Sequence, residues 1–139
     1  MSYDIRIDNA TIVDGTGAPG YQGSIGISGG KIVALGDAPD DAATIIDGTG
    51  KIASPGFIDI HTHYDAQIMW DRMLSVSPWH GVTTVLLGNC GFGIAPTRPK
   101  DRALIVGTLE KVEGMSRAAL NAGLGDWNFE SFPEYLDAI

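Results

Sequence analysis

Two histidines, His61 and His63, stand one residue apart at the end of the segment "PGFIDIHTHYDAQ". Residues i and i+2 of a β-strand point to the same face, so both imidazoles project together if the strand continues through them. Two imidazole nitrogens on one side of a strand end can both reach a zinc ion, at about 2 Å from each nitrogen. The H-x-H pattern alone is equally consistent with polar residues that mark where a strand reaches the surface. The apolar residues before it favour a buried strand, and therefore metal ligation.

Cys90 stands at the corresponding place in the next apolar segment, "VTTVLLGNCGFG". Segments 57–61 and 82–87 are predicted to be neighbouring parallel strands, so their carboxyl ends lie close together. The nearly continuous apolar run 82–87 is of the kind found in parallel sheets that are covered on both faces. A thiolate beside imidazoles suits zinc, which keeps the thiol ionised. On the residues alone, a small buried apolar role for this cysteine stays open. The glycines around it do not form the dinucleotide-binding fingerprint, so no nucleotide loop is predicted.

Three further polar residues near these segments are predicted to have structural roles. His80, the third histidine, lies in the short crossover before residues 82–87, towards the opposite end of that strand. Asp65 and Gln67 follow the H-x-H motif into a loop near the predicted metal. They either shape a pocket there or cap a helix or loop, and capping is the more common role.

The elements that must position these residues change in character near Ser54. Residues 1–54 alternate apolar and polar side chains between glycine-containing turns, which predicts strands, with a hairpin turn at "SGGK". The two "DGTG" segments predict loops that need positive φ. Residues 55–139 alternate strand and helix patterns, which is typical of an α/β fold.

Three helices are predicted in the second region. "SPWHG" predicts one helical turn, with Ser77 as N-cap and Pro78 at the first helical position. Residues 98–114 predict a longer helix. The predicted apolar stripe of this helix comprises Ala103, Val106, Leu109 and Val112. Ser131 and Glu134 have capping-box spacing, which predicts a final helix.

Charge and composition exclude several classes of function. The chain has 139 residues, with 17 acidic against 9 basic, and a net charge of −8. Without clusters of Lys and Arg, no nucleic-acid or anionic-membrane partner is predicted. The start "MSYDIRIDNA" lacks the features of a signal peptide, and no run approaches the ~20 apolar residues of a membrane span. One cysteine forms no internal disulfide, so the cytoplasm is the predicted location.

The same segments resemble the amidohydrolase superfamily, specifically its D-aminoacylase branch, the N-acyl-D-amino-acid deacylases. "HTH" after "PGFID" is shared with many amidohydrolases, whereas "GNCG" after "GVTT" is more specific to this branch, and the resemblance covers essentially the whole chain. It implies part of a small β-sandwich over residues 1–54 and the start of a metal-dependent (β/α)8 barrel over residues 55–139. It also implies that His61 and His63 correspond to the H-x-H metal ligands, and Cys90 to the ligand of a tightly bound zinc.

The activity implied by the resemblance is zinc-dependent hydrolysis of a small-molecule N-acyl-D-amino acid. Zinc activates a water molecule, and an aspartate from the last barrel strand of the family acts as general base. No histidine follows Cys90, and Asp101, Asp126 and Asp137 lie in helix or loop contexts. The general base and further ligands are therefore expected beyond residue 139, in the rest of the polypeptide or in a complementary chain.

Chain length leads to the same expectation. A (β/α)8 barrel takes roughly 250 residues, so the chain is expected to be the N-terminal part of an enzyme and inactive alone. Such a piece leaves strand edges unpaired and a face of its parallel sheet uncovered. Two alternatives stay open. A cyclic-amide hydrolase of the dihydroorotase or hydantoinase type is disfavoured by "GNCG", because those enzymes typically use a carboxylated lysine at that place. The other is a catalytically incomplete fragment that acts as a structural or interaction module.

Overall fold

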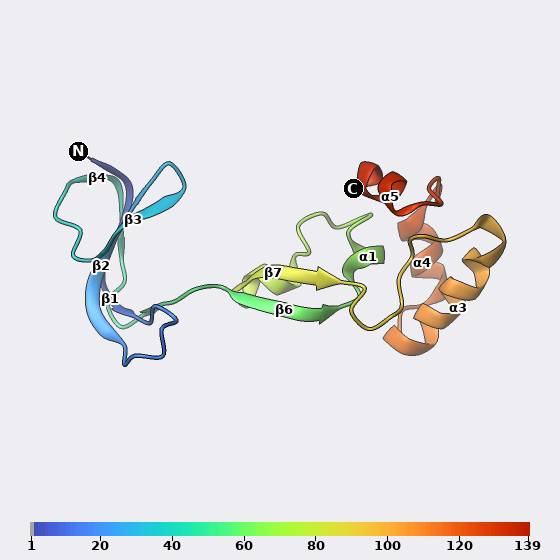
Figure 1. Ribbon diagram of the computed structural model, residues 1–139, viewed down its shortest axis with the longest axis horizontal. Coiled ribbons are helices and arrows are strands. Elements are labelled where there is room, and N and C mark those ends of the chain that lie inside the picture. Colours follow the sequence, from blue (N-terminus) through green and yellow to red (C-terminus); the bar gives the residue numbers. More distant parts are fainter. Residues whose placement is uncertain (1) are drawn as a thin grey trace. The chain divides into compact units, whose positions relative to one another are not determined.

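The computed structural model describes residues 2–139, which form two compact units (Figure 1). The first unit ends at Pro55 and the second spans Gly56–Ile139. The change of sequence pattern near Ser54 falls at the same place, whereas the assignment of the two units to a sandwich and a barrel stays a prediction. Within the described residues, no helix combines the length and the apolar character that crossing a membrane would need.

The first unit is a mixed β-sheet. Its strands are β1 (Tyr3–Ile12), β2 (Tyr21–Ser28), β3 (Lys31–Gly36), β4 (Ala42–Asp47) and β5 (Ile52–Ala53). The order is β3-β2-β1-β4, with β5 also beside β1; the β1–β2 and β2–β3 pairs are antiparallel, whereas β4 and β5 run parallel to β1. The predicted "SGGK" turn joins β2 to β3, with positive φ at both Gly29 (58°) and Gly30 (72°). A tight hairpin turn of this kind needs residues that tolerate the left-handed region.

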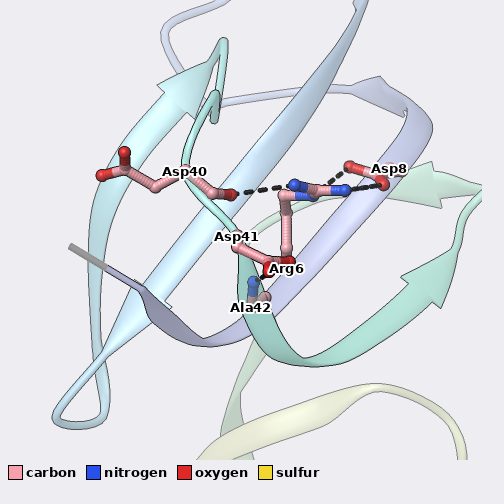
Figure 2. Close-up of polar contacts among 5 residues, drawn as sticks. All are labelled: Arg6, Asp8, Asp40, Asp41 and Ala42. Carbon is pink, nitrogen blue, oxygen red and sulfur yellow. Dashed lines mark hydrogen bonds and ion pairs between the residues drawn. The ribbon is translucent and has the colours of Figure 1, made fainter.

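Arg6 connects β1 to the segment that leads into the parallel strand β4 (Figure 2). Its Nε donates to Asp8 Oδ1 at 2.9 Å, and its Nη1 donates to the backbone oxygen of Asp40 at 2.8 Å. The backbone N–H of Ala42, the first residue of β4, donates to Asp41 Oδ1 at 2.9 Å. These contacts hold the connection that β1 and β4 require, because parallel neighbours cannot be joined by a tight hairpin.

The second unit places two parallel strands before a group of helices. The strands are β6 (Phe57–Thr62) and β7 (Val82–Leu87). The helices are α1 (Tyr64–Gln67), α2 (Val76–Trp79), the 3₁₀ turn η1 (Pro99–Asp101), α3 (Arg102–Glu113), α4 (Arg117–Leu124) and α5 (Phe132–Ala138). Helices α1, α3, α4 and α5 gather beyond the carboxyl ends of the two strands (Figure 1). Their buried core consists of Ala66, Ile94, Val106, Leu109, Leu120, Leu124, Phe129 and Tyr135.

Strands β6 and β7 keep much apolar surface in contact with solvent. Within the described residues they form a two-stranded sheet, so each strand has one unpaired edge. The exposed apolar residues on these strands include Phe57, Ile58, Ile60 and Leu86. The expectation of unpaired edges and an uncovered face is therefore confirmed: the sheet has two free edges, and its apolar side chains are exposed to solvent.

The structure corrects two details of the predicted helices. Helix α2 has Ser75, not Ser77, at its N-cap position, because Ser77 is buried and shares a 2.6 Å hydrogen bond with Tyr64 Oη. In α3 the predicted apolar stripe is only half right. Val106 and Leu109 are buried, whereas the two end members, Ala103 and Val112, are exposed because the core covers only the middle of that stripe.

Helix α4 was not predicted from the sequence pattern. Ser116 caps it by accepting a hydrogen bond from the Ala119 N–H at 3.1 Å, and Leu120 and Leu124 enter the core. The signal was a serine followed by the helix-forming residues "RAALNA".

Helix α5 begins with the capping box that the sequence predicts. Ser131 Oγ accepts from the Glu134 N–H, and Glu134 Oε2 accepts from the N–H groups of Ser131 (2.8 Å) and Glu130 (2.9 Å). Hydrogen bonds from the backbone N–H groups of Ser131 and Glu130 stabilise the charged carboxylate and lower the pKa of Glu134 below its ordinary value of 4.5.

Glu134→Gln is expected to reduce the free energy of unfolding at neutral pH and to flatten its dependence on pH. The folded-state pKa is the lower one, so the carboxylate stabilises the fold above the unfolded pKa and loses this contribution as the pH falls through the folded pKa. Urea unfolding at neutral and acidic pH measures both effects. Asp137→Asn removes the same charge from the other end of α5 and should not destabilise the chain at neutral pH. Identical pH dependence in the wild type and Glu134→Gln would contradict the expectation.

Candidate metal centre

The carboxyl ends of β6 and β7 bring His61, His63 and Cys90 together. His61 lies within β6, His63 follows the strand as the N-cap residue of α1, and Cys90 lies in the loop after β7. One ring nitrogen of each histidine and the Cys90 Sγ atom all lie within 4.8 Å of one another. Ligand atoms lie about 2.0–2.3 Å from a zinc ion, so three donor atoms this close together are a candidate ligand set for one ion.

The position of His63 differs slightly from the sequence-based picture. The strand does not continue through it, because the chain turns into α1 directly after Thr62. The two imidazole rings nevertheless stay on the same side, with centroids 5.7 Å apart. His80, in contrast, is exposed at the carboxyl end of α2, before β7, and does not belong to the cluster.

The two ring nitrogens of His63 have different surroundings. Nε2 lies 2.9 Å from Glu113 Oε1. Nδ1 is buried and has no hydrogen-bond partner. Buried polar atoms are normally paired, and a buried imidazole nitrogen without a partner is a group that a metal ion could satisfy. The residues present therefore fit a metal site.

Two hydrogen bonds fasten the loop that carries Cys90, one on each side of the cysteine. Asn89 Nδ2 donates to the backbone oxygen of Ile60 at 2.7 Å. Beyond the cysteine, the Ile94 N–H donates to Asp65 Oδ2 at 2.7 Å. Both acceptors belong to the segment that contains the two histidines, so the loop and the H-x-H motif are tied directly to one another. Asn89 was missed by sequence reasoning; an asparagine next to a cysteine at a strand end was the available signal.

Asp65 is a buried anchor of the loop. Its side chain is buried, and Oδ1 has no hydrogen-bond partner. Burial raises the pKa of this carboxyl above its ordinary value. Tyr135 Oη donates to the Asp65 backbone oxygen at 3.1 Å, and burial, followed by the Asp65 charge, raises the pKa of Tyr135 to about 12. Of the two alternatives for Asp65, loop capping fits this arrangement, and Gln67 donates to Asp71 Oδ2 at 3.1 Å instead of reaching the cluster.

Asn89→Ala is expected to weaken zinc binding by roughly five- to tenfold, the equivalent of one hydrogen bond. Without its bond to Ile60, the Cys90 loop loses one of its two ties to β6. Competition between the chain and a chromogenic zinc chelator measures the affinity. Asn128→Ala changes an exposed asparagine of the same unit and serves as the control. Equal affinities for the two variants would mean that the Asn89 bond does not position the thiol.

Comparison with known proteins identifies relatives over the whole chain. The amidohydrolase family matches residues 44–123. A D-aminoacylase from Alcaligenes xylosoxydans xylosoxydans is 36% identical over 138 residues, which cover 99% of this chain and 26% of that protein. An N-acyl-D-aspartate deacylase from the same organism is 44% identical over 94 residues, which cover 67% of this chain and 19% of that protein.

A solved structure agrees with these relatives. The N-acyl-D-glutamate deacylase from Bordetella bronchiseptica, complexed with zinc and a phosphonate inhibitor, superposes with a TM-score of 0.72 at 34% identity and covers 99% of this chain. The match covers 27% of that structure. Almost all of this chain is therefore aligned, but it spans only about a quarter of the length of these relatives. The family match extends over more than half of the sequence, and the chain belongs to the amidohydrolase family.

Proposed function

We propose that this chain supplies zinc ligands to a hydrolase that cleaves the amide bond of N-acyl-D-amino acids. Water adds across the amide, giving a carboxylate and a free D-amino acid. The convergence of His61, His63 and Cys90 within 4.8 Å carries the proposal. The similarity to a D-aminoacylase and to N-acyl-D-aspartate and N-acyl-D-glutamate deacylases supports this substrate class.

The three side chains would hold the metal in different ways. His61 and His63 offer neutral nitrogen ligands, and Cys90 offers a thiolate whose negative charge offsets part of the charge of the ion. Bound zinc would polarise the substrate carbonyl and lower the pKa of a coordinated water. Asn89 and Asp65 orient the cysteine by fastening its loop to the H-x-H segment.

In this proposal β6 and β7 are the first two strands of a (β/α)8 barrel, and the first unit is part of a small β-sandwich. Parallel pairing of the two strands supports the barrel assignment, as does the position of the cluster at their carboxyl ends. The general base and further histidine ligands would come from residues that have no counterpart in these 139, since the relatives are about four times longer.

Metal titration of the purified 139-residue chain tests the ligand set. The reduced, metal-free chain should bind Co²⁺ with a thiolate-to-cobalt charge-transfer absorption, and Zn²⁺ should displace the cobalt and abolish that absorption. Cobalt binding without the charge-transfer absorption would show that Cys90 is not a ligand. Failure to bind either ion would contradict the proposed site.

Hydrolysis assays test the substrate class. A longer polypeptide that contains this chain, loaded with zinc, should release the amino acid from N-acetyl-D-amino acids and not from the L-enantiomers. Ring opening of dihydroorotate or a hydantoin instead would favour the cyclic-amide alternative. The 139-residue chain alone should be inactive, and chelator-sensitive turnover by it would show that no further groups are needed.

A further inference from the structure

Helix α5 reaches back to the segment that carries the two histidines. Tyr135, in the middle of the helix, is 3% exposed, and its hydroxyl donates a hydrogen bond of 3.1 Å to the backbone oxygen of Asp65. The Asp65 carboxylate in turn accepts the Ile94 N–H at 2.7 Å. Segments far apart in the sequence are therefore joined by buried hydrogen bonds, which lead from α5 through α1 to the loop that carries Cys90.

We propose that Tyr135 is a positioning residue, which holds the Cys90 loop in place at the candidate metal centre by way of Asp65. The inference rests on the proposed zinc site. A backbone oxygen can only accept, so the phenol is the donor, and the bond fixes the peptide group that follows Asp65. The carboxylate of the same residue binds the Ile94 N–H, so the orientation of Asp65 determines where the loop is fastened.

The hydroxyl and the ring of Tyr135 have separate contacts. The ring lies in the core, with its centroid 5.3 Å from that of Phe129 and 5.9 Å from that of Phe132. These contacts need the ring alone, whereas the hydroxyl makes the bond to Asp65. Tyr135→Phe therefore removes the connection to the loop and keeps the packing of the core.

The helix that presents Tyr135 is itself fixed at both ends. The capping box of Ser131 and Glu134 holds its start, and near its other end Arg72 Nη2 donates to the backbone oxygen of Ala138 at 3.3 Å. A helix of seven residues is not stable by itself, so such contacts decide where it lies. A residue can position a site only from a supported element of this kind.

The zinc affinity of Tyr135→Phe provides the first test. A hydrogen bond that only stabilises the fold is present with and without the metal, and its loss leaves the affinity of the folded chain unchanged. A bond that positions the Cys90 loop reduces the ordering that must accompany binding. Tyr135→Phe should therefore bind zinc about five- to tenfold more weakly, the equivalent of one hydrogen bond. Competition with a chromogenic zinc chelator measures the difference.

Ser116→Ala is the matched control for stability. It removes the bond in which Ser116 Oγ accepts the Ala119 N–H at 3.1 Å, and so destabilises the same unit at α4 by a similar amount. This bond has no member in the Cys90 loop or in α1, so Ser116→Ala should bind zinc as the wild type does. Equal affinities for Tyr135→Phe and Ser116→Ala would overturn the proposal.

Amide hydrogen exchange provides a second test that needs no metal. In Tyr135→Phe the Ile94 amide should exchange at least about fivefold faster than in the wild type, since its acceptor is less firmly held. The Leu120 amide, which donates to the Ser116 backbone oxygen within α4, reports any loss of stability that the whole unit shares. Equal acceleration of the two amides would mean that the hydroxyl acts on stability alone, and the positioning role would be wrong.

The wild type decides the question if circular dichroism shows that Tyr135→Phe does not fold. Opening of α5 withdraws Tyr135 and should release the loop, so the Ile94 amide should be no better protected than the Tyr135 amide, which donates to the Ser131 oxygen. Greater protection of Ile94 would show that the loop keeps its place without α5, contrary to the proposal. If the wild type binds no zinc but Tyr135→Phe selectively accelerates Ile94, the zinc site fails and the positioning of the loop stands.

Discussion

Cys90→Ala is expected to weaken zinc binding on the order of 100-fold, whereas His80→Ala leaves it unchanged. Structural zinc sites with four ligands bind with about 10–16 kcal/mol, so one ligand represents about 3 kcal/mol, equivalent to roughly 100-fold. The variant removes both a bond and a negative counter-charge from the cluster of His61, His63 and Cys90. Chelator competition and metal analysis of purified variants measure the loss.

His80→Ala is the control for this experiment, because His80 lies at the opposite end of β7 from Cys90. His80 precedes the strand and is exposed, and Cys90 follows it. His61→Ala and His63→Ala should also weaken binding in this chain; in a complete protein with two metal positions they should lower activity and spare the tighter ion. Full zinc occupancy in Cys90→Ala, with loss of zinc in His80→Ala, would show that the ligands have been assigned to the wrong ends of the strands.

Phe129→Ala is expected to lower the free energy of unfolding of the second unit by about 3–5 kcal/mol. Phe129 is 1% exposed, and its ring centroid lies 5.7 Å from that of Trp127 and 5.3 Å from that of Tyr135. Its removal leaves a cavity in the core that holds Ile94, whose N–H is bonded to Asp65. Zinc affinity should therefore fall together with stability.

Phe132→Ala is the matched control for the core prediction. Phe132 touches the same Tyr135 ring, at 5.9 Å between centroids, but is 51% exposed. Its truncation should affect stability by much less, because little apolar surface is lost from the core. Urea unfolding followed by tryptophan fluorescence compares the two variants. Equal losses would mean that Phe129 does not anchor the core.

Local sequence pattern predicted the elements and the cluster well. Alternating residues identified the strands of the first unit, and the apolar run before "HTH" identified β6. The capping box at Ser131 was readable because both partners lie within one turn. His61, His63 and Cys90 come together because both strands end at one edge, which spacing and parallel pairing suffice to predict. Their role as ligands stays a prediction.

Contacts between residues far apart in the sequence could not be predicted from the local sequence pattern. The parallel pairing of β1 with β4 depends on a connection that no alternation reveals. Glu113 reaches His63 from a helix that begins in another part of the sequence. The burial of Ser77 moved the start of α2, because a tertiary hydrogen bond used the hydroxyl that local rules assign to a cap. In each case, the residue that determines the local structure lies far away in the sequence, where a pattern of neighbouring residues cannot reveal it.

The exposed sheet of β6 and β7 has a consequence for the colloidal behaviour of this chain. Each strand has one unpaired edge, and Phe57 and Ile58 are both 66% exposed. Apolar strand edges act as templates for pairing with further copies, so concentrated solutions should form β-rich assemblies. The net charge of −8 opposes this association by mutual repulsion. Because salt screens that repulsion, self-association should increase with ionic strength, and the chain should stay monomeric best in dilute, low-salt solution.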